Sequence, residues 1–184
     1  DLADGGGIDA GLVVNAAGPW CNQLSALAGA SVRWTLHPTR IQVGYRDWDP
    51  ALGELPTAAE ISSGTYFRPD AGGARVLFGS ILPEDEEELV ADPDDYNRAA
   101  DASFRDVKVH GLHHRVPALA YRGEVTGIAG LYTINREDVH PVVGPTDVDG
   151  FWVANGFSGH GFKLAPMIGS LVARAITGVE AEYD

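Results

Sequence analysis

The chain has 184 residues, of which 45% are hydrophobic, and it carries a formal net charge of −13 at pH 7. This length and composition predict a globular chain with a real core and argue against intrinsic disorder. The sequence has no cluster of Lys and Arg, which nucleic-acid binding requires, and no apolar run approaches the roughly 18 residues of a membrane span. It also shows no basic, apolar leader, so neither a membrane span nor a signal peptide is predicted.

The first predicted elements are a strand, a turn and a helix. Leu12–Asn15 is typical of a short buried strand, and Pro19–Ala28 of a helix that has proline in its first turn and ends at Gly29. Alanine and glycine in the turn Asn15–Gly18 let backbone pass close to a ligand. The same sequence is common in plain α/β packing, so the residues alone leave both interpretations open. The helix contains the single cysteine, Cys21, which we expect to be packed and unpaired; one free thiol fits a reducing compartment and predicts a cytoplasmic protein.

The next part of the chain predicts a sheet. In Val32–Arg46 apolar and polar residues alternate on both sides of Pro38, which predicts strand segments with an irregular middle. Asp47–Gly64 has few large apolar residues and is predicted to be a surface loop. Thr65–Pro69 and Arg75–Ser80 predict a β-hairpin, because a short glycine-containing turn separates two apolar runs.

Acidic residues gather in one segment, since eight of the 26 acids lie within Glu84–Asp95. We interpret this segment as a solvated loop, with an acidic docking surface as the alternative. It ends in Asp92-Pro-Asp-Asp95, which predicts a helix start, because aspartate caps helices and proline is favoured in the first turn. The helix is expected to run to about His114. On it, His110 and His113 share a face with His114, as metal ligands would, but no nearby cysteine or acid completes a set and no metal site is predicted.

The last part of the chain contains the most informative motif. Glu124–Thr133 and Phe151–Ala154 predict strands, and the run Asn155-Gly-Phe-Ser-Gly-His-Gly-Phe-Lys163 precedes an apolar helix. Because proline is tolerated only in the first helical turn, Pro166 predicts a helix start near Lys163. Three glycines, the helix dipole and the lysine together favour an anion at this place. A glycine-rich loop before a core helix is the alternative that the residues leave open. The order of strands and helices predicts a mixed α+β fold.

Several of these segments resemble a known family. The runs 130–144 (Gly-Leu-Tyr-Thr-Ile-Asn-Arg-Glu-Asp-Val-His-Pro-Val-Val-Gly) and 150–169, which includes Gly-Phe-Ser-Gly-His-Gly-Phe-Lys, resemble the carboxy-terminal signature of the D-amino-acid oxidase superfamily. They are most similar to its sarcosine oxidase and dimethylglycine dehydrogenase branch. Val13–Trp20 is similar to the family's central strand and turn, and Pro38–Gln42 follows in the expected order. Members of this family are FAD-dependent enzymes that oxidise the carbon–nitrogen bond of amino acids and N-methylated amines.

The resemblance implies a largely antiparallel substrate-domain sheet with flanking helices, joined to terminal segments of an FAD-binding α/β domain. It assigns residues 1–30 and 130–184 to the FAD-binding domain and 31–129 to the substrate domain. The family's Gly-x-Gly-x-x-Gly turn, which holds the ADP part of FAD, has no counterpart here, because Gly5-Gly-Gly7 lacks the strand before it and the helix after it. We therefore expect the carboxy-terminal half of an enzyme, inactive alone, that needs an N-terminal FAD-binding segment in cis or from a partner chain.

The resemblance also implies a flavin site built from two loops. The predicted cofactor-binding residues are Ala17, Gly18, Trp20, Gly156, Phe157, Ser158, Gly159, His160, Gly161, Phe162 and Lys163. Gly130 stands where some relatives carry a cysteine bonded to the flavin, so FAD is predicted to be non-covalent. Leu77 stands where some oxidase relatives place an oxygen-activating lysine, which favours a dehydrogenase.

Three residues of the sequence are predicted to be catalytic. By resemblance Lys163 pairs with the substrate carboxylate, with a helix-end lysine as the alternative. His160 lies between two glycines and is either near the flavin or a packing histidine, and Tyr66 either lines the substrate pocket or belongs to the core. The sequence thus predicts hydride transfer to FAD from a small substrate of the sarcosine, dimethylglycine or D-amino-acid type. The alternative is a non-catalytic binding or assembly subunit that kept the fold.

Overall fold

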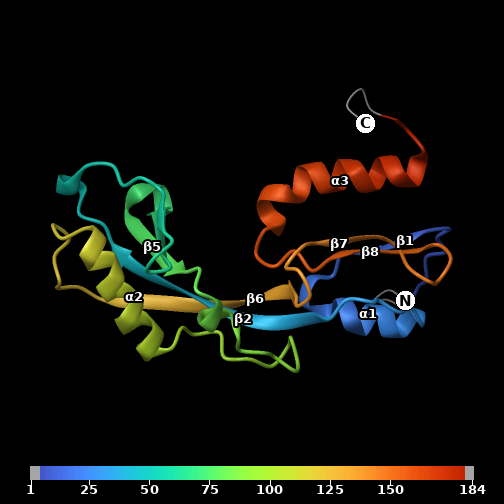
Figure 1. Cartoon of the computed structure of the whole chain (residues 1–184), viewed down its shortest axis with the longest axis horizontal. Coiled ribbons are helices and arrows are strands. Elements are labelled where there is room, and N and C mark those ends of the chain that lie inside the picture. Colours follow the sequence, from blue (N-terminus) through green and yellow to red (C-terminus); the bar gives the residue numbers. More distant parts are fainter. Residues whose placement is uncertain (1–4, 181–184) are drawn as a thin grey trace. The chain divides into compact units, whose positions relative to one another are not determined.

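The computed structural model describes residues 5–180, which form two compact units (Figure 1). The first unit contains the described residues up to Pro38 and those from Tyr132 onward, and the second is Thr39–Leu131. These boundaries fall at residues 38 and 131, whereas the sequence predicts them at 30 and 129. Both boundaries lie within long strands, β2 (Leu36–Asp47) and β6 (Val125–Asn135).

The first unit is built on a three-stranded sheet with the order β1-β8-β7. β1 pairs in parallel with β8, and β7 pairs antiparallel with β8. Buried Cys21, Leu36, Val142 and Val153 form its apolar core. The elements of this unit are β1 (Val13–Asn15), the 3₁₀ helix η1 (Gly18–Trp20), α1 (Cys21–Ala28), β7 (Val142–Pro145), β8 (Phe151–Asn155) and α3 (Gly161–Thr177).

The second unit is built on a five-stranded sheet with the order β3-β4-β5-β2-β6. The pairs β3–β4, β4–β5 and β5–β2 are antiparallel, and α2 packs on β4 and β5. Its core contains Trp48, Phe67, Val76, Phe78, Leu112 and Leu119. Besides β2 and β6, its elements are β3 (Ala58–Glu60), β4 (Thr65–Asp70), β5 (Arg75–Ser80), α2 (Ala102–Arg115) and the 3₁₀ helices η2 (Pro50–Leu52), η3 (Ala71–Gly73) and η4 (Pro83–Glu86).

The structure confirms the predicted α+β class with its largely antiparallel sheet. The first strand, the helix that ends at Gly29 and the hairpin of β4 and β5 are also confirmed; Gly29 has the left-handed conformation (φ 68°) that stops a helix. The predicted burial of the first strand is wrong among the described residues, because β1 is an edge strand with Val13 and Val14 exposed. The short strands β3 and β7 were not predicted as strands. β7 contains a glycine and a proline and is held by its pairing with β8, from Val142 opposite Asn155 to Pro145 opposite Trp152.

The predicted irregular middle of Val32–Arg46 is wrong, because β2 is one continuous strand through Pro38. Proline lacks an N–H and interrupts a strand only where that group is needed for pairing. The pairing of β2 with β5 covers Gly44–Asp47. Pro38 lies near the start of the strand, so its missing donor does not break that ladder.

The predicted helix start at Asp92 is also wrong, because α2 begins at Ala102. The Asp92 side chain accepts a hydrogen bond from the Asp94 amide (2.9 Å) and closes a local turn. The chain that follows is extended: the Ala129 amide donates to the Arg98 carbonyl (2.8 Å) and the Ala100 amide to the Gly127 carbonyl (3.3 Å). These long-range bonds outcompete the local preference for helix.

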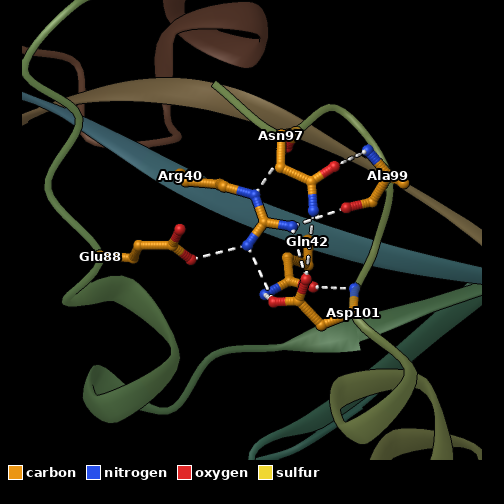
Figure 2. Close-up of polar contacts among 6 residues, drawn as sticks. All are labelled: Arg40, Gln42, Glu88, Asn97, Ala99 and Asp101. Atoms are coloured by element: carbon orange, nitrogen blue, oxygen red, sulfur yellow. Dashed lines mark hydrogen bonds and ion pairs between the residues drawn. The ribbon is translucent and has the colours of Figure 1, made fainter. Parts of the chain in front are cut away.

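Arg40 holds three segments of the second unit together, as Figure 2 shows. Its side chain is 2% exposed; Nη1 contacts Glu88 (2.7 Å) and Asp101 (2.9 Å). Nε and Nη2 donate to the carbonyls of Asn97 (2.7 Å) and Ala99 (2.6 Å). Together these bonds join β2, the acidic segment and the residues before α2.

The acidic segment is therefore anchored at two points. Glu88 pairs with Arg40, and Asp85 pairs with Lys108, whose side chain is buried. The Glu88 side chain remains 53% exposed. The segment is thus a surface loop, as predicted, but it is one held against the second unit by ion pairs.

Asp101 provides a pH test of this cluster. The hydrogen bond from Arg40 holds the pKa of the Asp101 carboxyl below its ordinary value. A carboxyl whose pKa is lower in the folded state contributes stability above its unfolded pKa of about 3.9 and loses it as the pH falls through the folded pKa. We expect the difference in unfolding free energy between the unmodified chain and Asp101→Asn to narrow below about pH 4. Urea titrations from pH 2 to 7 measure this difference in unfolding free energy. A difference that does not change with pH would contradict the lowered pKa of Asp101.

Candidate functional site

The loop and the turn predicted to bind a cofactor lie at one edge of the first unit's sheet. β1 and β8 are parallel and in register, with Asn15 opposite Val153, and each is followed by a loop and a helix. The carboxyl ends of parallel strands are where ligands bind in open α/β sheets. A direct bond joins the two loops, because Asn155 Nδ2 donates to the Gly18 carbonyl (3.0 Å).

Two buried asparagines at the ends of these strands hold the loops. Asn155 Oδ1 accepts from the Gly156 amide (2.7 Å), and Asn15 Oδ1 accepts from the Ala17 amide (3.2 Å). Asn15 Nδ2 also donates to the Cys21 carbonyl (2.9 Å) and to Ser25 Oγ (3.1 Å). Sequence reasoning missed both residues. The available signal was an asparagine at the last position of each strand.

Ser158 fixes the middle of the loop to β6. It has a left-handed backbone (φ 47°), which a residue other than glycine adopts only when its surroundings hold it there. Its amide donates to the Thr133 carbonyl (3.1 Å), and its hydroxyl accepts from the Asn135 amide (3.1 Å) and donates to the Gly156 carbonyl (3.2 Å). The loop is therefore a fixed structure, with Phe157 bridged to Ile134.

Gly156 is a loop glycine at which a side chain would collide with a core residue. Its φ is 69°, and a Cβ there would lie 2.8 Å from Leu36 Cδ2. Gly156→Ala is therefore expected to lower the unfolding free energy by about 1–3 kcal/mol. Urea denaturation measures this. Gly11→Ala, where a Cβ meets no atom within 4 Å and φ is not positive, should be nearly neutral; equal effects at both positions would contradict the packing argument.

Helix α3 begins two residues earlier than predicted, at Gly161, with His160 as its N-cap. Pro166 therefore lies beyond the first turn. The carbonyl that its missing N–H would have contacted belongs to Phe162, which is 99% exposed, so water can satisfy that carbonyl. The Leu164 amide donates to the His160 carbonyl (3.3 Å), which leaves the amides of residues 161–163 without helical partners.

The start of α3 has a locally positive character in a strongly acidic chain. Its first turn contains no acid, and Lys163 is exposed with no ion-pair partner among residues 5–180. His160 is also exposed, and its Nδ1 donates to the Ser158 carbonyl (2.9 Å), so it is not a buried packing histidine. The free amides, the helix dipole and Lys163 converge on one place that favours negative charge.

This arrangement fits one part of a flavin nucleotide. The amides of α3 suit the electron-rich pyrimidine side of the ring, and Gly18 (φ 55°) leaves open space where another residue would place its Cβ. Ala17 and Gly18 are half-buried, whereas Trp20 is more exposed. No segment of residues 5–180 carries the Gly-x-Gly-x-x-Gly turn that holds the ADP part, so the described chain fits only the ring end.

Tyr66 belongs to the second unit and is half-buried on β4. It lies opposite Gly79 on β5, and its ring covers the place where a Cβ of that glycine would be. The ring thus supports the sheet, and its role in a substrate pocket stays a prediction. Leu77 is buried on β5.

The three histidines of α2 do not converge. His113 is buried, accepts a hydrogen bond from Arg46 Nη1 (2.8 Å) and stacks on Tyr121 (4.1 Å between ring centroids). Burial, and secondly the Arg46 charge, lower the pKa of His113. His110 and His114 contact each other edge to face. In the described part of the chain no group of three or more His, Cys, Asp or Glu residues could hold a metal ion.

Cys21 is buried and free, and burial raises the pKa of its thiol. Such a thiol is packed rather than reactive, as the sequence predicts. Within residues 5–180 no helix has the length and apolarity needed to cross a membrane.

Comparisons with known proteins agree with this geometry. The sequence pattern of the family described as "FAD dependent oxidoreductase" matches residues 2–175. The chain is 36% identical over 181 residues to FAD-dependent oxidoreductase domain-containing protein 1 of Bos taurus, covering 92% of this chain and 36% of that protein. It is 31% identical over 185 residues to monomeric sarcosine oxidase of Streptomyces avermitilis, covering 94% and 46%.

Solved structures show the same fold. L-proline dehydrogenase from P. horikoshii superposes with a TM-score of 0.78 at 24% identity, covering 95% of this chain and 45% of that one. Glycine oxidase from Geobacillus kaustophilus superposes with a TM-score of 0.68 at 25% identity, covering 94% and 43%. The chain spans less than half the length of each of these four relatives. Family, fold and cofactor are thus as the resemblance implies: this chain belongs to the FAD-dependent oxidoreductases, a family of flavoproteins.

Proposed function

We propose that this chain is part of an enzyme that oxidises the carbon–nitrogen bond of an amino acid or an N-methylated amine. The observation that carries the proposal is the start of α3, where three free amides and the unpaired Lys163 meet at the carboxyl edge of the sheet. Two relatives support the substrate class by name: the monomeric sarcosine oxidase and the 4-methylaminobutanoate oxidase of Paenarthrobacter nicotinovorans, which is 28% identical over 189 residues.

The chemistry supplied by FAD, when bound, would be acceptance of a hydride equivalent from the substrate carbon. The chain's own groups bind and orient. The amides of residues 161–163 would stabilise negative charge on the pyrimidine side of the ring, and Lys163 would pair with the substrate carboxylate. His160 lies at the same helix start, and the hydrogen bond from its Nδ1 to the Ser158 carbonyl fixes the orientation of its ring. Position 130, where some relatives carry a cysteine bonded to the flavin, is a glycine, so we propose that FAD is bound non-covalently.

The proposal also includes a further segment that binds the ADP part of FAD, in cis or from a partner chain. The first unit exposes apolar surface that such a segment would cover. β1 lies at an edge of the described sheet with Val13 and Val14 exposed. None of the residues of α3 is buried, although Met167 and Leu171 belong to its apolar side. Exposed apolar side chains on a sheet edge and along a helix are the kind of surface that an interface would cover.

The test uses the complete protein that contains this chain. Purified with its native partners, it should be yellow, lose its flavin on acid denaturation, and bleach anaerobically with sarcosine, dimethylglycine, proline or glycine. Bleaching by an amine that carries a carboxylate, and none by a carboxylate alone, would support oxidation of the carbon–nitrogen bond. Colourless protein that still binds a partner would favour the non-catalytic assembly subunit. Flavin that none of these amines reduces would contradict the proposed substrate class.

The isolated 184-residue chain should bind FAD weakly and lack activity, because the described residues fit only the ring end of the cofactor. Titration of the chain with FAD, followed by flavin fluorescence, measures the affinity. Tight binding with one FAD per chain would contradict the proposed need for a further segment.

A further inference from the structure

We infer that Asn155 is a positioning residue: it holds the loop before α3 and the turn after β1 in one fixed relation, so that both meet the flavin together. The inference rests on the proposed function. It adds a residue outside the predicted set, in which the loop residues begin at Gly156.

Asn155 contacts both loops with the oxygen and the nitrogen of its side-chain amide. Oδ1 accepts from the Gly156 amide (2.7 Å), where the loop begins, and Nδ2 donates to the Gly18 carbonyl (3.0 Å), where the turn becomes η1. The residue is 1% exposed. Water therefore cannot replace either bond, and an unpaired amide or carbonyl in this place would be costly.

Each loop is also anchored separately, so the contribution of Asn155 is the relation between them. Ser158 ties the loop to Thr133 and Asn135 of β6. Asn15, the last residue of β1, accepts a hydrogen bond from the Ala17 amide of the turn and donates one to Ser25 of α1. Neither of these anchors connects the loop with the turn. Loss of the Asn155 side chain should leave both loops folded while their relative position becomes looser.

Relative position matters because hydride transfer depends strongly on distance and orientation. A displacement of about 1 Å between a bound ring and its substrate can reduce the rate about a hundredfold. A bound ring would meet Gly18 on the side of the turn and the α3 amides on the side of the loop. A change in their relation would therefore shift the flavin while leaving Lys163, and with it the binding of the substrate carboxylate, largely unchanged.

The experiment compares Asn155→Ala with Asn22→Ala in the complete protein. Asn22 is a matched control, because its Nδ2 donates to the Leu36 carbonyl (2.8 Å) within the same unit but touches neither loop. We expect Asn155→Ala to slow flavin reduction roughly ten- to a hundredfold and to change the visible circular dichroism of the flavin. KM should change less than about threefold, as expected when a positioning interaction rather than uniform substrate binding is lost. Asn22→Ala should leave the rate and the spectrum unchanged.

A second readout does not need the flavin. In the apo protein, amide hydrogen exchange should become faster in Asn155→Ala in two peptides together, one covering 16–20 and one covering 156–160, while the control leaves both unchanged. Asn155→Ser, too short to reach both groups, should act in the same direction if the alanine variant is unstable. Equal effects of Asn155→Ala and Asn22→Ala on rate and spectrum would overturn the inference. Failure of both Asn155 variants to fold would also overturn it, because Asn155 would then be a structural residue. A complete wild-type protein without flavin would refute the proposed function instead, and the exchange experiment would still report whether the two loops are coupled.

Discussion

Replacing Lys163 by alanine in the complete protein is expected to weaken the binding of a carboxylated amine roughly 10- to 150-fold while FAD retention stays unchanged. A charge-assisted hydrogen bond contributes about 1.5–3 kcal/mol, which corresponds to this range. Lys163 is one of only two lysines in the chain, and the other, Lys108, is buried against Asp85 in the second unit. Within residues 5–180 Lys163 has no carboxylate partner, so its charge is available to a ligand.

Two controls separate substrate recognition from other roles of Lys163. Lys163→Arg keeps the positive charge and should retain most of the affinity. An amine substrate without a carboxylate should bind the unmodified protein and Lys163→Ala equally, because the lost bond has no counterpart in that substrate. Steady-state and anaerobic reduction kinetics measure both. If the alanine variant binds the carboxylated substrate normally, Lys163 is a surface lysine at a helix end.

Replacing Arg40 by methionine is expected to lower the unfolding free energy of the chain by about 2–4 kcal/mol. Methionine preserves much of the apolar stem but removes the bonds to two carbonyls and two carboxylates (Figure 2). The side chains of Glu88 and Asp101 are 53% and 42% exposed, so water can solvate them after the change. The expected cost therefore begins below the range of about 3–5 kcal/mol for breaking a fully buried ion pair and overlaps its lower half.

Arg98→Met is the matched control for Arg40→Met. Arg98 is exposed and lies between Asn97 and Ala99 in the segment that Arg40 holds. Its guanidinium lies over the ring of Tyr96, 5.5 Å from the ring centroid. Its loss should cost less than about 1 kcal/mol. Urea denaturation at neutral pH compares the two variants. Similar midpoints for both would show that the Arg40 cluster contributes little to stability.

Patterns within a few residues predicted much of the fold. The β1–turn–α1 unit, the hairpin of β4 and β5 and the strand β8 each follow from local apolar spacing and turn chemistry. The same kind of signal failed at Asp92. There a capping motif exists, but the backbone of Arg98 and Ala100 is bonded to β6, and such pairing depends on residues distant in the sequence.

For the site, the sequence by itself determined the family and the glycine-rich loop with Lys163, because the backbone freedom of glycine and the charge of lysine are properties of the residues themselves. Only the tertiary structure decided what holds that loop. Asn155 and Gly18 are 137 positions apart, and Ser158 and Asn135 are 23 apart, so no local pattern could pair them. The start of α3 at Gly161 likewise depends on whether water can reach the Phe162 carbonyl, and solvent exposure is a property of the folded chain.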